Sequence, residues 1–135
     1  MGARVLVDSS VWVDALADPG SPLAAGVDEL LAEPGRAATT GVILQEVLQG
    51  VRSPRQVAQV ATMLGGLTYL PASREVHKRA AALYRSLRAR GITAHTVDVL
   101  VPQVALDHGA AVWSLDHHLT EIAGRTKLRL YRPVT

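Results

Sequence analysis

The chain has 135 residues, of which 48% are hydrophobic and 19% are charged. A chain of this length buries about two-thirds of its unfolded surface in one core, so we expect one domain over residues 1–135. Cysteine is absent, which excludes disulfides, thiolate metal sites and cysteine nucleophiles. The apolar runs are far shorter than the roughly 20 residues of a membrane helix, and we find no targeting segment. We therefore expect a cytoplasmic protein without membrane attachment.

The net charge of +2 is distributed unevenly. Residues 1–50 carry two Lys or Arg and seven Asp or Glu, a net charge of −5, whereas residues 51–100 carry eight and two, a net charge of +6. Such asymmetry is typical either of a protein with a polyanionic partner, such as nucleic acid, or of helices with differently charged solvent faces.

In the first half of the chain, apolar triplets alternate with helical patterns. Asp8-Ser9-Ser10 supplies side chains that can cap a helix. In chain order, the expected elements are a strand over residues 5–7, a helix over 11–17, a helix from Pro22 that Pro34-Gly35 ends, a strand over 37–39 and a helix from Thr40-Gly41 to about Gly50.

The second half continues this alternation. The expected elements are a helix from Pro54 that Gly65-Gly66 ends, a strand over residues 67–70, a helix from Ser73 to Arg90, a helix from about Val97 to His108, a strand over 110–114, a helix over 119–123 and a strand over 128–130. If the helix that contains Pro102 begins close to Asp98, this proline falls near the end of its first turn, where a missing amide has little effect. Short, uniformly apolar strands between helices are typical of parallel sheets covered on both faces. The predicted fold class is α/β, with three layers, α/β/α, and a central parallel sheet.

Four carboxylates are candidates for a site, and two of them stand where this fold class binds ligands. Ligands bind beyond the carboxyl ends of parallel strands, and Asp8 and Asp116 each follow an expected strand. Asp98 lies near the start of a helix, which it can cap, or it can face the same edge. Glu46 lies in an apolar helical stretch, where an unpartnered charge is unfavourable. Taken singly, each has a simpler interpretation as an N-cap or, for Glu46, as the partner of an arginine.

Taken together, the four carboxylates indicate a metal site. Carboxylates gathered at one sheet edge repel each other by about 4 kcal/mol per pair at ~4 Å and an effective dielectric constant near 20. No Lys or Arg lies in the immediate segments of Asp8, Glu46 or Asp116 to offset this repulsion. Ligation by oxygen atoms alone suits a hard divalent ion, Mg²⁺ or Mn²⁺.

Four motifs then carry a resemblance to a known family. They are Val7-Asp8-Ser9-Ser10-Val11-Trp12, Leu44-Gln45-Glu46-Val47, the segment from Gly91 through Thr96-Val97-Asp98-Val99-Leu100, and His108-Gly109-Ala110-Ala111-Val112-Trp113-Ser114-Leu115-Asp116-His117-His118-Leu119. In this order and at these separations they resemble the PIN-domain ribonucleases, specifically the VapC-type toxins, over essentially the whole chain.

The resemblance implies a single PIN domain that hydrolyses RNA as the toxin of a toxin–antitoxin system, with a cognate antitoxin and a homodimeric state. Its acidic cluster, which would hold Mg²⁺ or Mn²⁺ and carry the catalysis, corresponds here to Asp8, Glu46, Asp98 and Asp116. Ser10 and Ser114 match hydroxyl positions that would steady the site. His118 stands where the family often has a second aspartate.

Two other functions remain open at this point. His117-His118 adjoins Asp116, and His95 lies near Asp98, so a metal-independent nuclease that uses histidine as acid and base is conceivable. The second is a non-catalytic RNA- or protein-binding module that retains the PIN fold. A phosphoacceptor receiver domain is disfavoured, because no aspartate lies between Asp28 and Asp98 to follow a middle strand.

Surface and core assignments complete the predictions. On the helix from Ser73, four basic residues project opposite the expected core stripe of Val76, Ala80, Leu83 and Leu87. The four are Arg74, Lys78, Arg85 and Arg88, and they form either an RNA-binding surface or an ordinary solvated face. Trp12 and Trp113 are expected in the core, although Trp12 and Leu16 are also candidates for partner contacts.

Overall fold

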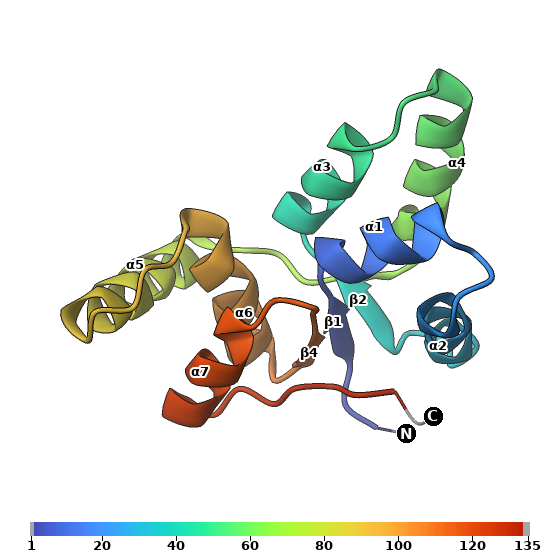
Figure 1. The fold of residues 1–135 in the computed structure, drawn as a ribbon. Coiled ribbons are helices and arrows are strands. Elements are labelled where there is room, and N and C mark those ends of the chain that lie inside the picture. Colours follow the sequence, from blue (N-terminus) through green and yellow to red (C-terminus); the bar gives the residue numbers. More distant parts are fainter. Residues whose placement is uncertain (1, 134–135) are drawn as a thin grey trace.

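The computed structural model describes residues 2–133, in which four strands alternate with helices (Figure 1). The strands are Val5–Val7 (β1), Ala37–Thr39 (β2), Thr68–Tyr69 (β3) and Ala111–Trp113 (β4). The helices are Ser9–Ala17 (α1), Pro22–Leu31 (α2), Gly41–Gln49 (α3), Pro54–Gly65 (α4), Arg74–Ala89 (α5), Thr96–His108 (α6) and His118–Arg125 (α7).

The strands form one parallel sheet in the order β3-β2-β1-β4. The chain moves from β1 through β2 to β3 in one direction across the sheet, and then returns past β1 to β4. Because parallel crossovers are right-handed, this reversal places α1 to α4 on one face and α5 and α6 on the other, as Figure 1 shows. The predicted three-layer α/β/α fold is confirmed.

Burial on both faces explains why the central strand β1 is uniformly apolar. Val5, Leu6 and Val7 are each at most 1% exposed. Trp12 packs at the start of the sheet's first crossover, where its indole Nε1 donates to the Val7 carbonyl over 3.1 Å, and Trp113 is also buried. The assignment of both tryptophans to the core is confirmed, and Trp12 is therefore not available for partner contacts.

The expected strand over residues 128–130 is wrong, because only Leu130 forms a bridge, to Val112. In β4, the Ala111 N–H and the Trp113 carbonyl are bonded on the β1 side, to Arg4 and Asp8. Only Val112 turns its N–H and carbonyl outward, where they meet the Arg129 carbonyl and the Tyr131 N–H. A three-residue strand therefore offers one residue for pairing at this edge.

Two helix starts differ from the predicted ones. Helix α1 begins at Ser9, so Ser9 and Ser10 lie within it rather than before it. Helix α6 begins at Thr96, which makes Pro102 its seventh residue and contradicts the placement in the first turn. Since proline has no amide hydrogen, the Asp98 carbonyl lacks its usual partner four residues later. No helix among the described residues combines the length and apolarity needed to cross a bilayer.

Candidate active site

Asp8 occupies the N-cap position of α1 without capping it. Its side chain accepts no hydrogen bond from the helix amides. Instead, Asp8 Oδ2 accepts hydrogen bonds from Ser10 Oγ at 2.9 Å and from Ser114 Oγ at 2.8 Å. The simpler interpretation of Asp8 as a cap is therefore wrong, and the two serines that the sequence assigned to support the site hold its carboxylate in place.

The pairing of β1 with β4 brings the ends of these strands together. The Asp8 amide donates to the Trp113 carbonyl over 2.9 Å, which sets Asp8 beside the turn that carries Asp116. In that turn the Asp116 amide donates to Ser114 Oγ at 3.0 Å, and the Leu115 amide donates to Ser10 Oγ at 3.1 Å. The same two hydroxyls thus fix both the first carboxylate and the backbone that positions the last one.

Asp98 has two roles in the structure. Its Oδ2 accepts the backbone N–H of His95 over 2.9 Å, so it helps to fix the start of α6. It is also only partly buried, and it lines the cavity that the other carboxylates line. The capping interpretation and the site interpretation are therefore compatible for Asp98.

Glu46 is held by a residue that sequence reasoning missed. Ser9 Oγ donates to Glu46 Oε1 over 3.0 Å, from α1 to α3. No Lys or Arg forms an ion pair with Glu46 among the described residues, so the predicted alternative of an arginine partner is not realised there. The only signal for this contact is that Ser9 lies beside Asp8, and a separation of 37 residues cannot be paired from local pattern.

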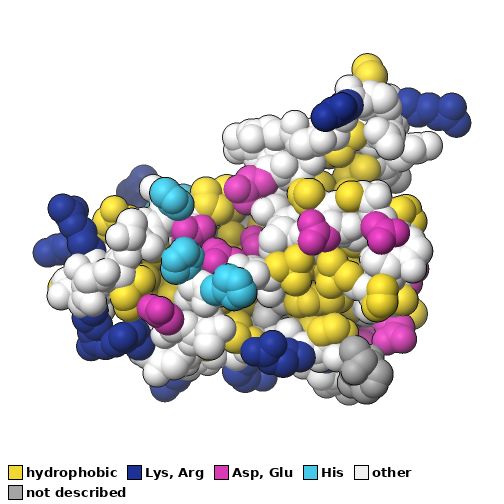
Figure 2. Space-filling model, viewed as in Figure 1, with side chains coloured by type: hydrophobic (Ala, Val, Ile, Leu, Met, Phe, Trp, Pro, Cys, Tyr) yellow, Lys and Arg dark blue, Asp and Glu magenta, His cyan; other side chains and the backbone are white. Residues whose placement is uncertain are grey.

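All four carboxylates line one cavity of about 70 Å³. Its other walls are Ser9, Val97, Val101, Pro102, Ser114 and Leu119, so no Lys or Arg of the described chain lines it. Figure 2 shows acidic side chains gathered near the middle of this face, flanked by histidines, with Lys and Arg at its periphery. A small, oxygen-lined cavity with uncompensated negative charge fits a hard divalent cation.

The geometry adds a histidine to this set. One ligand atom each from Asp98, Asp116 and His118 lies within 4.8 Å of the other two. His118 Nδ1 is 3.0 Å from Asp116 Oδ1. The group of Asp98, Asp116 and His118 contains neither His95 nor His117. Among the described residues, the three histidines considered for acid–base chemistry therefore form no cluster of their own.

The comparisons with known proteins agree with this architecture. The PIN domain family model matches residues 5–125. The chain belongs to the PIN-domain family. A curated relative, ribonuclease VapC11 of Mycobacterium tuberculosis, is 32% identical over 128 residues, which are 93% of this chain and 96% of the relative. This relative places the chain among the VapC ribonucleases within the PIN-domain family.

Solved structures share the fold at lower identity. A toxin–antitoxin complex from Klebsiella pneumoniae contains a chain that superposes with a TM-score of 0.73 at 17% identity, over 97% of this chain and 100% of that one. VapC20 of Mycobacterium tuberculosis, described as a sarcin-ricin loop cleaving toxin, gives a TM-score of 0.66 at 17% identity, over 88% and 95%. The arrangement of strands and helices found here is thus the PIN fold.

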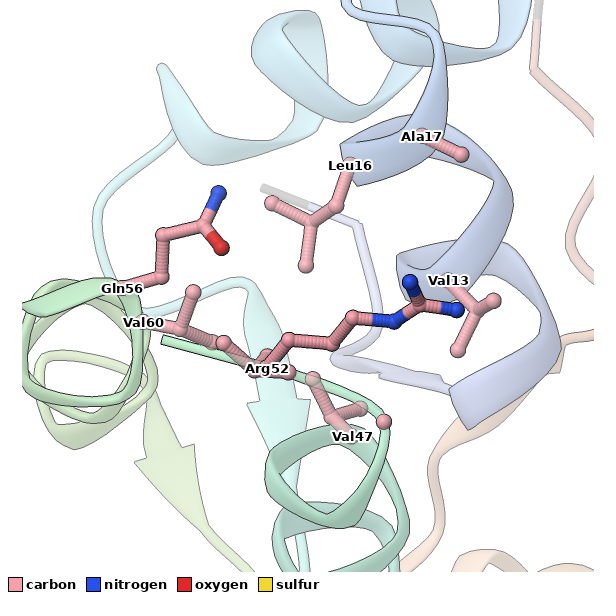
Figure 3. A pocket seen from close by; sticks show the side chains of 9 residues that line it. Val13, Leu16, Ala17, Val47, Arg52, Gln56 and Val60 are labelled. Atoms are coloured by element: carbon pink, nitrogen blue, oxygen red, sulfur yellow. The ribbon is translucent and has the colours of Figure 1, made fainter. Parts of the chain in front are cut away.

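Two hollows larger than the carboxylate cavity lie away from it. One, of about 330 Å³, is an apolar groove between α1, α3 and α4, into which Val13 and Leu16 project from α1. Figure 3 shows the Arg52 side chain extending across this groove toward Val13. Another, of about 340 Å³, lies between α5 and α6 and is lined in part by Tyr84 and Arg85.

The predicted basic stripe on α5 is exposed. Arg74, Lys78, Arg85 and Arg88 all face solvent, whereas Val76, Ala80 and Leu87 of the opposite stripe are buried. Lys78 Nζ lies 3.6 Å from Glu75 Oε1, and such an exposed ion pair contributes little to the stability of the fold. The stripe is thus placed as expected, and its contact with RNA stays a prediction.

Proposed function

We propose that this VapC-family protein is a Mg²⁺- or Mn²⁺-dependent endoribonuclease that acts as the toxin of a toxin–antitoxin system in the cytoplasm. The observation that carries the proposal is the cavity in which Asp8, Glu46, Asp98 and Asp116 converge without a Lys or Arg. Its support from relatives is the ribonuclease activity named for VapC11.

In this proposal each side chain has a defined task. Asp8, Asp98 and Asp116 would hold the cation, and the bonds from Ser10 and Ser114 keep Asp8 from rotating away. Glu46, with one oxygen held by Ser9, would hold a second ion or accept the proton of the attacking water. A bound divalent cation would activate water as the nucleophile and neutralise the charge on the phosphate.

The test is cleavage of RNA by the purified, partner-free protein. We expect cleavage with Mg²⁺ or Mn²⁺, none in EDTA, and products with 5′-phosphate and 3′-hydroxyl ends. Cyclic-phosphate ends that persist in EDTA would instead support histidine acid–base chemistry. Metal and RNA binding without turnover would support the alternative of a non-catalytic module that keeps the fold.

We further propose that the cognate antitoxin docks in the apolar groove between α1, α3 and α4. Val13 and Leu16 are 47% and 41% exposed, although both are large apolar side chains. They line the groove together with Val47 and Val60, and Arg52 supplies a cation beside them. This surface suits an apolar segment that carries an acidic residue. The homodimer that the resemblance implies stays a prediction.

Leu16→Glu should weaken the binding of the antitoxin, measured as its affinity for the purified variant. A charge in the apolar groove is expected to weaken binding by about 30-fold, which corresponds to the roughly 2 kcal/mol of an interface hot spot. RNA cleavage should be unchanged, because the groove and the carboxylate cavity share no lining residue. Tyr69→Glu, which alters an exposed side chain on β3 outside the groove, is the matched control. An affinity for the antitoxin that is unchanged in Leu16→Glu would contradict this docking site.

The basic stripe on α5 should contribute to RNA affinity through phosphate contacts. Each contacting residue that is changed to glutamine should lower the salt slope of single-strand RNA binding by about 0.7. The measurement is a salt titration in EDTA, so that the RNA stays intact, with Arg55→Gln on α4 as the control. If all four variants, at Arg74, Lys78, Arg85 and Arg88, keep the wild-type slope, the stripe is an ordinary solvated face.

A further inference from the structure

His118 is the part of the site that the mechanism above leaves without a task. It is the first residue of α7, two positions after Asp116, and its side chain is 48% exposed. The Asp116 side chain is 32% exposed. Both groups are therefore accessible to ions from solution, and Asp116 also lines the carboxylate cavity.

We propose that His118 supplies a nitrogen ligand to the divalent cation and thereby makes this site favour Mn²⁺ over Mg²⁺. The proposal rests on the metal-dependent function proposed above and specifies its ion. It concerns His118 because its imidazole lies in one group of potential ligand atoms with the carboxylates of Asp98 and Asp116.

The distances agree with shared ligation. In an octahedral site with metal–ligand bonds of 2.0–2.1 Å, neighbouring ligand atoms are about 3 Å apart and opposite ones about 4 Å apart. His118 Nδ1 and Asp116 Oδ1 are 3.0 Å apart, and the ligand atoms of Asp98, Asp116 and His118 all fall within 4.8 Å of one another. One ion can therefore contact all three side chains after small rotations.

The backbone holds this pair in place. The His118 amide donates to Asp116 Oδ1 over 3.0 Å, so the turn before α7 fixes the carboxylate relative to the residue that carries the imidazole. Asp116 Oδ2 accepts no hydrogen bond from the described residues. Oδ1 thus orients the turn and lies beside His118 Nδ1, and Oδ2 has no hydrogen bond from the described residues that would compete with a cation.

The donor chemistry then selects between the two ions. Mg²⁺ prefers oxygen ligands and an undistorted octahedron. Mn²⁺ also takes oxygen ligands and stands at the weak end of the first-row series, but as a transition-metal ion it accepts an imidazole nitrogen more readily than Mg²⁺ does. An imidazole in place of a carboxylate also removes one negative charge, which weakens the electrostatic attraction for either ion but leaves Mn²⁺ the compensating Mn–N bond.

Pulsed EPR of the Mn²⁺-loaded full chain tests the ligand directly. We expect a ¹⁴N coupling from a directly bound nitrogen in the wild type and in His117→Ala, a control that removes the neighbouring imidazole. The coupling should be lost in His118→Asn, which keeps an N–H donor for Asp116. A purely positioning role for His118, through its hydrogen bond to Asp116, would give no such coupling in the wild type and would overturn the proposal.

Calorimetric titration provides the second readout. His118→Asp should lower the ratio of Mn²⁺ affinity to Mg²⁺ affinity by about tenfold, because it replaces the nitrogen ligand, which favours Mn²⁺, with an oxygen ligand that suits both ions. An unchanged ratio would overturn the role of His118 while leaving the metal site intact, provided that Asp116→Asn still abolishes binding. If the wild type binds no Mn²⁺ at all, both this inference and the proposed metal-dependent function fail.

Discussion

Asp116→Asn is expected to reduce RNA cleavage by about 10²- to 10⁴-fold, the equivalent of roughly 3–5 kcal/mol of transition-state stabilisation. Asparagine has nearly the same volume, and its carbonyl oxygen can still accept the His118 amide that Asp116 Oδ1 accepts at 3.0 Å. The substitution therefore removes a ligand charge with little change to the turn. Asp8→Asn and Asp98→Asn should act in the same direction for the same reason.

The measurement is the initial rate on a defined RNA in Mg²⁺ and in Mn²⁺, with the folded state checked by circular dichroism. Asp28→Asn, at an exposed position on α2, is the matched control and should keep the wild-type rate. If Asp116→Asn is folded and retains full activity, the carboxylate cavity is not the active site. Loss of all activity in His118→Ala, together with full activity in the aspartate variants, would move the assignment to histidine chemistry.

The products carry independent information on the nucleophile. When water attacks phosphorus, its oxygen forms the new P–O bond, the bond from phosphorus to the 3′-oxygen breaks, and that oxygen takes up a proton. The ends are then a 5′-phosphate and a 3′-hydroxyl, and a 2′-deoxy substitution at the scissile nucleotide should leave cleavage intact. Histidine acid–base cleavage would need the 2′-hydroxyl as nucleophile and would stop with that substrate.

The fold and the convergence of Asp8 and Asp116 could be predicted from the local pattern around β1 and β4. Each strand is a buried triplet followed at once by polar residues, so the position of Asp8 and Asp116 at a strand end follows from local pattern alone. The prediction required these two strands to be neighbours. The pairing of β1 with β4, with Val7 opposite Trp113, confirms that they are. Glu46 and Asp98 stood out by their local surroundings, an apolar helical stretch and a helix start, and the family resemblance then placed both in one acidic cluster.

What the sequence could not predict depends on contacts between distant segments. The hydrogen bond from Ser9 to Glu46 spans 37 residues, and the bond from Ser114 to Asp8 spans 106. Local rules also assigned Asp8 to helix capping, and two serine hydroxyls from different elements override that preference. The missing strand at Leu130 has the same origin, because the apolar pattern was present but β4 has only one residue with free backbone groups on that side.

Because the carboxylates lie close together, Asp116→Asn should change the melting temperature in opposite directions without and with divalent metal. In EDTA, Asp116→Asn should raise the melting temperature, because ligand atoms of Asp98 and Asp116 lie within 4.8 Å of each other. Two charges at that distance repel by about 1 kcal/mol when solvent screens them fully. The Asp116 side chain is 32% exposed, so we take this value for the gain in the free energy of unfolding. For a chain of this length, about 1 kcal/mol corresponds to a rise of roughly 3–5 °C.

Divalent metal should reverse this order. A ligand that binds only the folded state stabilises it by RT ln(1 + [L]/Kd), which is about 2.7 kcal/mol at one hundred times Kd. Wild type should therefore melt roughly 10 °C higher with saturating Mg²⁺ or Mn²⁺ than in EDTA. Asp116→Asn should lose most of that increment and fall below wild type, while Asp28→Asn should follow wild type in both buffers. Thermal melts of the three proteins in each buffer measure the effect. A wild-type melting temperature that is the same with and without metal would contradict the site. The reason is that the fold holds four carboxylates around a cavity that no Lys or Arg of the described residues lines, so a bound cation should stabilise it.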